Sequence, residues 1–128
     1  MPDASITVEY LLGTRRGRVA AQVLEADDLV APELLDAEVL SVLRRAVLHG
    51  EVPAAVAAST LDRLVAWPVR RVPHAPLVQR AFALRANYSA YDALYVAVAE
   101  LFQAPILTCD GRLSRAPSLA QVEIRNVR

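Results

Sequence analysis

The segment 87–102, NYSAYDALYVAVAELF, constrains the fold more than any other part of the chain. Coiled as a helix, it is apolar on nearly every side, and a helix of that kind is buried in the core of a protein. Ser89 stands where an N-cap is expected, just before the apolar run begins. The sequence therefore predicts a buried helix of about four turns, with the rest of the chain packed around it.

Asp92 is an unusual residue for such a helix. At 100° per residue its side chain falls near Tyr95 and Val96, so the carboxylate starts in apolar surroundings. An unpaired buried charge is costly, and it usually takes up a proton or finds a cation. Two roles are open: Asp92 can form a capping box with Ser89, or it can bind a metal ion.

Length and composition limit the classes of protein to which the chain can belong. Its 128 residues, 55% of them hydrophobic, predict one globular domain over 1–128 and exclude a disordered chain. The formal net charge of zero gives no general attraction to nucleic acid. A single cysteine, no secretion signal and no apolar run of about 18 residues together predict a cytoplasmic protein without membrane spans.

Hydrophobic periodicity, prolines and glycines divide the chain into short apolar strands separated by helices. The expected helices are 6–12, 19–24, 32–48, 53–66, 76–85 and 87–102, and the expected strands after the first are 29–31, 69–72, 105–108 and 122–127. Ser5 is expected to cap the first helix. This alternation predicts an α/β fold with three α/β/α layers, in which a short-stranded, mainly parallel central sheet carries helices on both faces.

Acidic residues from distant segments are expected to meet at one edge of this sheet. Asp3 ends the first strand, and Glu38 lies near the start of the long helix. Asp92 lies in the first turn of the buried helix, and Asp110 follows strand 105–108. Asp36 lies beside Glu38 in sequence, and periodicity alone does not choose between them. Strand carboxyl ends and helix amino ends share one edge of a parallel sheet. Clustered carboxylates need cations or protons, and oxygen ligands suit Mg²⁺ or Mn²⁺, which can promote phosphodiester hydrolysis.

Four short motifs carry a family resemblance. They are DAS at 3–5, PELLDAEVLSVLRR at 32–45, YDALYVAVAE at 91–100 and TCDGRL at 108–113. Each is weak alone, but their order and spacing over nearly the whole chain are specific. The chain resembles the PIN-domain ribonucleases, and most closely the VapC toxins of VapBC toxin–antitoxin modules. The resemblance assigns the acidic site to Asp3, Glu38, Asp92 and Asp110, and therefore favours Glu38 over Asp36.

The resemblance also implies an activity and partners. It implies a Mg²⁺- or Mn²⁺-dependent endoribonuclease that cleaves structured RNA such as tRNA or rRNA, forms a homodimer and is bound by a VapB-like antitoxin. Asp3, Asp92 and Asp110 are expected to hold the metal directly or through water, and Glu38 to orient a water molecule. Family members carry several apolar residues before the first aspartate. Here only Met1 and Pro2 do, so the first strand is expected to be truncated.

Polar and basic residues flank the acids. Ser5 and Thr108 are either a cap and a strand end or hydrogen-bond partners of a carboxylate or of metal-bound water. Four arginines can hold RNA phosphate or simply be solvated: Arg15 and Arg16 in an expected loop, and Arg112 and Arg115 on an expected helical turn.

Two other functions compete with the nuclease. A phosphoacceptor receiver domain has a similar acidic pocket but uses a lysine, and all fourteen basic residues here are arginine. The other alternative is a degenerate PIN domain that only binds an antitoxin or RNA. Binding of divalent ions by the four acids discriminates between this alternative and the enzyme.

Overall fold

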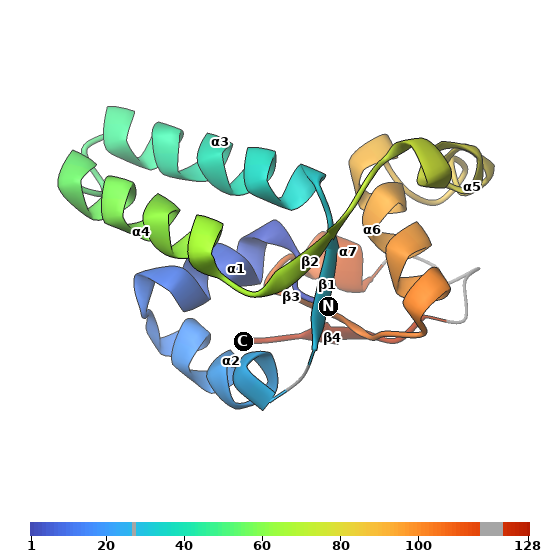
Figure 1. Ribbon diagram of the computed structural model, residues 1–128, viewed down its shortest axis with the longest axis horizontal. Coiled ribbons are helices and arrows are strands. Elements are labelled where there is room, and N and C mark those ends of the chain that lie inside the picture. Colours follow the sequence, from blue (N-terminus) through green and yellow to red (C-terminus); the bar gives the residue numbers. More distant parts are fainter. Residues whose placement is uncertain (27, 116–121) are drawn as a thin grey trace.

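The structure, a computed structural model, describes residues 1–26, 28–115 and 122–128 of the 128-residue chain. Helices alternate with short strands along the sequence, as expected (Figure 1). The helices are α1 Ala4–Leu12, α2 Arg15–Ala26, α3 Leu34–Leu48, α4 Ala54–Ala66, the 3₁₀ turn η1 Ala75–Leu77, α5 Val78–Ala83, α6 Ala90–Phe102 and α7 Gly111–Ser114. The strands are β1 Leu29–Pro32, β2 Val69–Val72, β3 Ile106–Thr108 and β4 Ile124–Asn126.

The strands pair in parallel, which confirms the prediction of a mainly parallel sheet. Strand β1 pairs with β2, and β3 pairs with β4. Within the described residues, the first strand is reduced to one bridge, between Pro2 and Leu107. The Leu107 N–H donates to the Met1 carbonyl at 2.8 Å, and the Asp3 N–H donates to the Leu107 carbonyl at 3.0 Å. These bonds fix the backbone of Asp3 beside β3.

Helices lie on both sides of the strands, in line with a three-layer α/β/α arrangement. Figure 1 shows the strands through the middle of the molecule, with α1, α2, α3 and α4 on the left and α5 and α6 on the right. Helix α1 packs closely on α2 and also contacts α3. In the described part of the chain, no helix is both long enough and apolar enough to cross a membrane.

Helix α6 is buried, as its sequence predicts. Ala93, Val96, Val98 and Ala99 have no exposed surface, and the helix packs on α5, β1 and β3. The Ser89 hydroxyl accepts a hydrogen bond from the Asp92 N–H at 3.2 Å, so Ser89 is the N-cap. The cap places Asp92 in the first turn, at the end of α6 that faces the candidate site.

The start of α1 differs from the expectation. The helix begins at Ala4, and Asp3 caps it in place of Ser5, because the Asp3 carboxylate accepts the Ile6 N–H at 3.1 Å. Aspartate and serine are comparable N-caps, so composition could not decide between neighbouring candidates.

Helix α2 is also longer than predicted, and it includes residues 15–17 that were expected to be a loop. The Thr14 hydroxyl accepts the Gly17 N–H at 3.2 Å and so supports the first turn. Gly17 lies against α1, where a Cβ atom would come within 2.1 Å of the Glu9 carbonyl oxygen. The glycine thus serves a close approach of two helices, and Arg15 and Arg16 lie on α2.

Other boundaries shift by a few residues. Pro32 belongs to β1, where it lies opposite Val72, so α3 starts two residues later than expected. The expected helix 76–85 is divided into η1 and α5. Strand β4 is shorter than the expected 122–127.

Candidate active site

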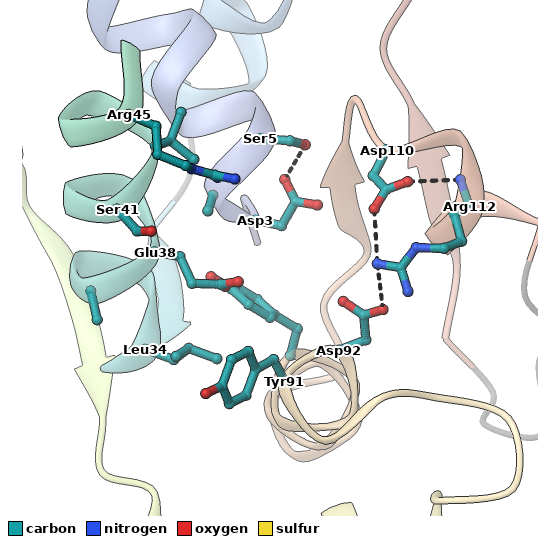
Figure 2. Close-up of a pocket in the computed structure, with 14 residues that line it drawn as sticks. Asp3, Ser5, Leu34, Glu38, Ser41, Arg45, Tyr91, Asp92, Asp110 and Arg112 are labelled. Carbon is teal, nitrogen blue, oxygen red and sulfur yellow. Dashed lines mark hydrogen bonds and ion pairs between the residues drawn. The ribbon is translucent and has the colours of Figure 1, made fainter. Parts of the chain in front are cut away.

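The four predicted acids line one cleft of about 440 Å³. Each comes from a different part of the fold: Asp3 caps α1, Glu38 lies on α3, Asp92 lies in the first turn of α6, and Asp110 caps α7 after β3 (Figure 2). The lining is completed by Ala4, Ser5, Leu34, Ala37, Ser41, Val42, Arg45, Tyr91, Tyr95 and Arg112. The structure therefore brings together acidic side chains that are up to 107 residues apart in sequence.

Asp3 is the most buried of these acids, with only 6% of its surface exposed. Its Oδ1 atom accepts hydrogen bonds from the Ser5 hydroxyl at 2.6 Å and from the Ile6 N–H at 3.1 Å. Burial raises the pKa of Asp3, and these hydrogen bonds lower it in part. The bonds also fix the carboxylate in place at the cleft.

Ser5 and Thr108 connect Asp3 to the backbone around Asp110. The Ser5 hydroxyl accepts the Cys109 N–H at 2.8 Å and lies 3.3 Å from the Thr108 hydroxyl. The Thr108 hydroxyl, which is fully buried, accepts the Asp110 N–H at 2.8 Å. Both side chains thus lie next to the acids, as the sequence predicts, and they connect α1 to the end of β3.

Glu38 faces other acids across the cleft. Burial raises the pKa of Glu38, and the negative charges of Asp3 and Asp92 raise it further. The buried Tyr95 hydroxyl lies near this carboxylate and lowers its pKa, although it makes no hydrogen bond of regular geometry with the residues that the structure describes. Burial and the Glu38 charge in turn raise the pKa of Tyr95. The mutual repulsion indicates that the cleft favours a cation or a proton.

Arg112 is the basic residue in contact with two of these acids. Its Nη2 atom lies 3.2 Å from Asp92 Oδ2 and 3.2 Å from Asp110 Oδ2 (Figure 2). The Asp92 side chain is 18% exposed and the Arg112 side chain 66%. The carboxylate of Asp92 therefore points into the cleft and pairs with a cation, while its backbone N–H is used by the Ser89 cap.

The donor set fits a divalent ion in its chemistry. Four carboxylates provide oxygen ligands only, which is what Mg²⁺ and Mn²⁺ prefer. Among residues 1–26, 28–115 and 122–128, however, no three acidic, histidine or cysteine side chains are close enough to form a finished cation site. Ser5 bonds to a single oxygen of Asp3, which leaves that carboxylate able to bind an ion. Arg112 contacts Asp92 Oδ2 and Asp110 Oδ2, so an ion at these two oxygens would require Arg112 to move.

The other predicted arginines lie outside the cleft. Arg15 and Arg16 line a separate pocket of about 410 Å³ together with Glu9, Thr14 and Arg128. Glu9 of this pocket lies on α1, the helix that Asp3 caps at the acidic cleft, so α1 connects the two. Arg115 is exposed at the end of α7 and is not part of the described lining of the cleft.

Asp36 is used elsewhere in the fold. Its carboxylate accepts hydrogen bonds from the Arg71 guanidinium at 3.1–3.3 Å, between α3 and β2. The sequence was undecided between Asp36 and Glu38 until the family resemblance was considered. The structure places Glu38, and not Asp36, in the cleft lining.

Sequence reasoning missed four polar lining residues, Ser41, Arg45, Tyr91 and Tyr95. A signal for two of them was available, because Ser41 and Arg45 follow Glu38 by three and seven residues and so share its face of a helix. The two tyrosines carried no such signal. Tyr95 is buried and Tyr91 is 60% exposed, and both belong to the lining of the cleft.

Comparison with known proteins identifies the family. A model of the PIN domain matches residues 1–119. This chain belongs to the PIN-domain family. Among curated relatives it is 42% identical to "Ribonuclease VapC1" of Mycobacterium tuberculosis (strain ATCC 25618 / H37Rv) over 128 residues, which cover 98% of this chain and 96% of that protein.

Further relatives carry similar names. The chain is 37% identical to "Ribonuclease VapC12" of the same strain over 114 residues, covering 89% of this chain and 88% of that protein. It is 38% identical to "VapC ribonuclease Mb0985" of Mycobacterium bovis (strain ATCC BAA-935 / AF2122/97) over 112 residues, covering 88% and 86%. Within the PIN-domain family the chain is therefore a VapC-type member, which confirms the resemblance seen in the sequence.

Proposed function

We propose that this protein is an endoribonuclease, the toxin of a VapBC-type toxin–antitoxin system, and that it hydrolyses phosphodiester bonds in RNA. The observation that carries the proposal is the convergence of Asp3, Glu38, Asp92 and Asp110 on one cleft. Relatives that cover most of the chain are named ribonucleases, which supports the same reaction.

The chemistry is proposed to depend on Mg²⁺ or Mn²⁺. A divalent cation supplies Lewis acidity when bound, which neutralises charge on the phosphodiester and lowers the pKa of water. Asp3, Asp92 and Asp110 are the residues that would hold it, directly or through water. Because burial and neighbouring charges raise the pKa of Glu38, its carboxylate is a better proton acceptor than an ordinary one. Glu38 is therefore proposed to orient a water molecule and accept its proton.

Basic residues around the cleft are proposed to hold the RNA backbone. Arg45 and Arg112 line the cleft itself, and Arg15 and Arg16 line the neighbouring pocket. Guanidinium groups bind phosphate oxygens through paired N–H donors. The substrate is proposed to be a structured cytoplasmic RNA such as tRNA or rRNA, whose cleavage stops translation.

Assembly and inhibition complete the proposal. A VapB-like antitoxin is proposed to bind the protein and block the acidic cleft, and the active form is proposed to be a homodimer of single-domain chains spanning 1–128. The names of the relatives support the VapC assignment, and the VapB-like partner follows from it.

Cleavage of cellular RNA by the purified protein, free of antitoxin, tests the function. We expect discrete fragments with Mg²⁺ or Mn²⁺ and none with EDTA. Asp92→Asn should abolish cleavage, because Asp92 lines the cleft, whereas Asp62→Asn on the exposed side of α4 should leave it unchanged. Metal-dependent fragments of the same size from the Asp92→Asn protein would contradict the proposed site.

One observation favours a second function, binding without catalysis. Arg112 already pairs with two of the four acids, and its one positive charge offsets one of their two negative charges. Such a pairing is expected in a degenerate PIN domain that binds only an antitoxin or RNA, because its acids no longer bind a metal ion. Absence of cleavage by well-folded protein with either metal would favour this function over the nuclease.

A further inference from the structure

Arg112 occupies the space between two acids that come from different elements. Its Nη2 atom is 3.2 Å from an oxygen of Asp92 on α6 and 3.2 Å from an oxygen of Asp110 at the start of α7. The backbone of Arg112 is fixed as well, because its N–H donates to Asp110 Oδ1 at 2.8 Å. Figure 2 shows the guanidinium directly between the two carboxylates. One monovalent cation therefore bridges two anionic groups.

These contacts are incompatible with a divalent ion at the same oxygens. Mg²⁺ binds carboxylate oxygens at about 2.0–2.1 Å and keeps a full shell of ligands around it. A guanidinium in contact with the same Oδ2 atoms of Asp92 and Asp110 excludes that shell. Arginine stays protonated at any physiological pH, so it cannot leave these carboxylates by losing its charge. It has to move.

The position of Arg112 makes such a movement inexpensive. Its side chain is 66% exposed, and ion pairs at that level of exposure contribute little to stability because water screens them. The guanidinium is carried on a long, flexible side chain at the mouth of the cleft. The pairing is thus strong enough to hold two acids together, and weak enough to be exchanged.

We propose that Arg112 is an exchangeable counter-ion of the acidic cleft: it pairs with Asp92 and Asp110 until a divalent cation displaces it, and it then binds an RNA phosphate at the cleft mouth. The inference rests on the proposed function, since it takes these acids as ligands of the ion. Phosphate accepts the same forked pair of N–H donors as carboxylate. Divalent binding consequently frees the group that binds RNA, and each ligand favours the binding of the other.

Calorimetric titration of the purified full-length chain with Mn²⁺ tests the exchange. Arg112→Gln removes the competing charge and is expected to tighten Mn²⁺ binding roughly 2- to 30-fold, the range for two exposed ion pairs. Arg44→Gln is the control, because Arg44 is exposed on α3 outside the described lining of the cleft, and it should bind Mn²⁺ as the unaltered chain does. Thermal melting of all three proteins in EDTA checks their folding.

The exchange can also be tested in the unaltered protein, without any substitution. In a Mg²⁺ titration followed through the NMR signals of arginine Nε–Hε groups, the Arg112 signal should shift in a saturable manner and that of Arg44 should not. Equal or weaker Mn²⁺ binding by Arg112→Gln, or an Arg112 signal that stays fixed while Mg²⁺ saturates the site, overturns the inference.

The outcomes also separate this inference from the proposed function. Metal-dependent RNA cleavage combined with unchanged Mn²⁺ affinity in Arg112→Gln would reject the exchange and leave the nuclease intact. Tightened Mn²⁺ binding without any RNA cleavage would support the exchange and reject the nuclease. Failure of all three proteins to bind Mn²⁺ would reject both the metal site and the exchange.

Discussion

The negative charge of Glu38 lowers the stability of the folded protein. Its carboxylate is partly buried and faces Asp3 and Asp92, which together raise its pKa. Glu38→Gln removes the charge and keeps the shape. We expect it to abolish nuclease activity and, in EDTA at pH 7–8, to raise the free energy of unfolding by about 0.5–2 kcal/mol, as is common when functional sites are neutralised. Chemical denaturation measures this change.

The gain in unfolding free energy of Glu38→Gln should depend on pH, because the pKa of Glu38 is raised in the folded protein. Above the raised pKa, Glu38 is ionised in both the folded and the unfolded state, and the folded state carries the full cost of the charge. Below its ordinary pKa the group is protonated in both states and the cost is gone. The advantage of Glu38→Gln should therefore shrink as the pH falls towards 4, the ordinary range for glutamate. A gain that stays constant from pH 8 to pH 4 would exclude this cause.

Ser5 stabilises the cleft through two hydrogen bonds: its hydroxyl donates to the Asp3 carboxylate and accepts from the Cys109 N–H. Ser5→Ala leaves a backbone donor without its partner and raises the pKa of Asp3 further. We expect a loss of about 1–3 kcal/mol in unfolding free energy. Ser59→Ala, on the exposed face of α4, should cost less than about 0.5 kcal/mol. Similar losses in the two variants would argue against this network.

The residues of the cleft differ in how far their sequence predicts them. Asp3, Glu38, Asp92 and Asp110 could be predicted because ends of strands and helices in a parallel sheet converge, and because four motifs matched one family. The pairing of Arg112 could not, since it depends on the direction in which one long side chain leaves α7. Asp36 illustrates the same limit, because its partner Arg71 is 35 residues away in another element.

At the scale of elements, Arg71 joins α3, α4 and β2. Its guanidinium pairs with Asp36 on α3 and donates to the carbonyls of Leu64 at 2.7 Å and Trp67 at 2.9 Å. This arrangement holds the α3–α4 pair that carries Glu38. Arg71→Gln should lower the free energy of unfolding by about 1.5–3 kcal/mol, the range for hydrogen bonds that involve a charged group.

The neighbouring arginine provides the control for that prediction. Arg70 is exposed and lies over the Phe102 ring at 5.1 Å, a contact worth about 0.5–1 kcal/mol at an exposed site. Thermal or urea unfolding of Arg70→Gln should thus show a clearly smaller loss than Arg71→Gln. Equal losses would mean that the bonds from Arg71 to α3 and α4 contribute little.

The elements themselves were largely predictable, because apolar periodicity separates helices from strands, and α6 was found from its apolar surface alone. Their starting residues were not. Helix α2 begins at Arg15 because Thr14 supports its first turn and because Gly17 permits close packing on α1. The second cause is a tertiary contact, which local sequence does not reveal.

At the scale of the whole molecule, RNA binding has to come from local charge, because the chain has no net charge. The acidic cleft repels phosphate until cations enter it, so approach of RNA depends on basic groups beside the cleft. The Arg16 side chain is 52% exposed and lies 4.0 Å from Glu9. Together with Arg15 and Arg128 it lines a pocket that α1 connects to the cleft, since Glu9 lies in that pocket and Asp3 caps the same helix. This pocket is the expected contact for phosphates flanking the cleaved bond.

Salt dependence measures that contact directly. In EDTA, where RNA is not cleaved, Arg16→Gln should weaken RNA binding and reduce the slope of log affinity against log salt concentration by about one, the value for a single lost phosphate contact. Arg44→Gln, on the exposed face of α3, removes the same charge away from both pockets and should leave the slope unchanged. If both variants lowered the slope equally, RNA binding would depend on the total charge of the protein. The proposed contact of RNA phosphates with the pocket of Arg15 and Arg16 would then be rejected.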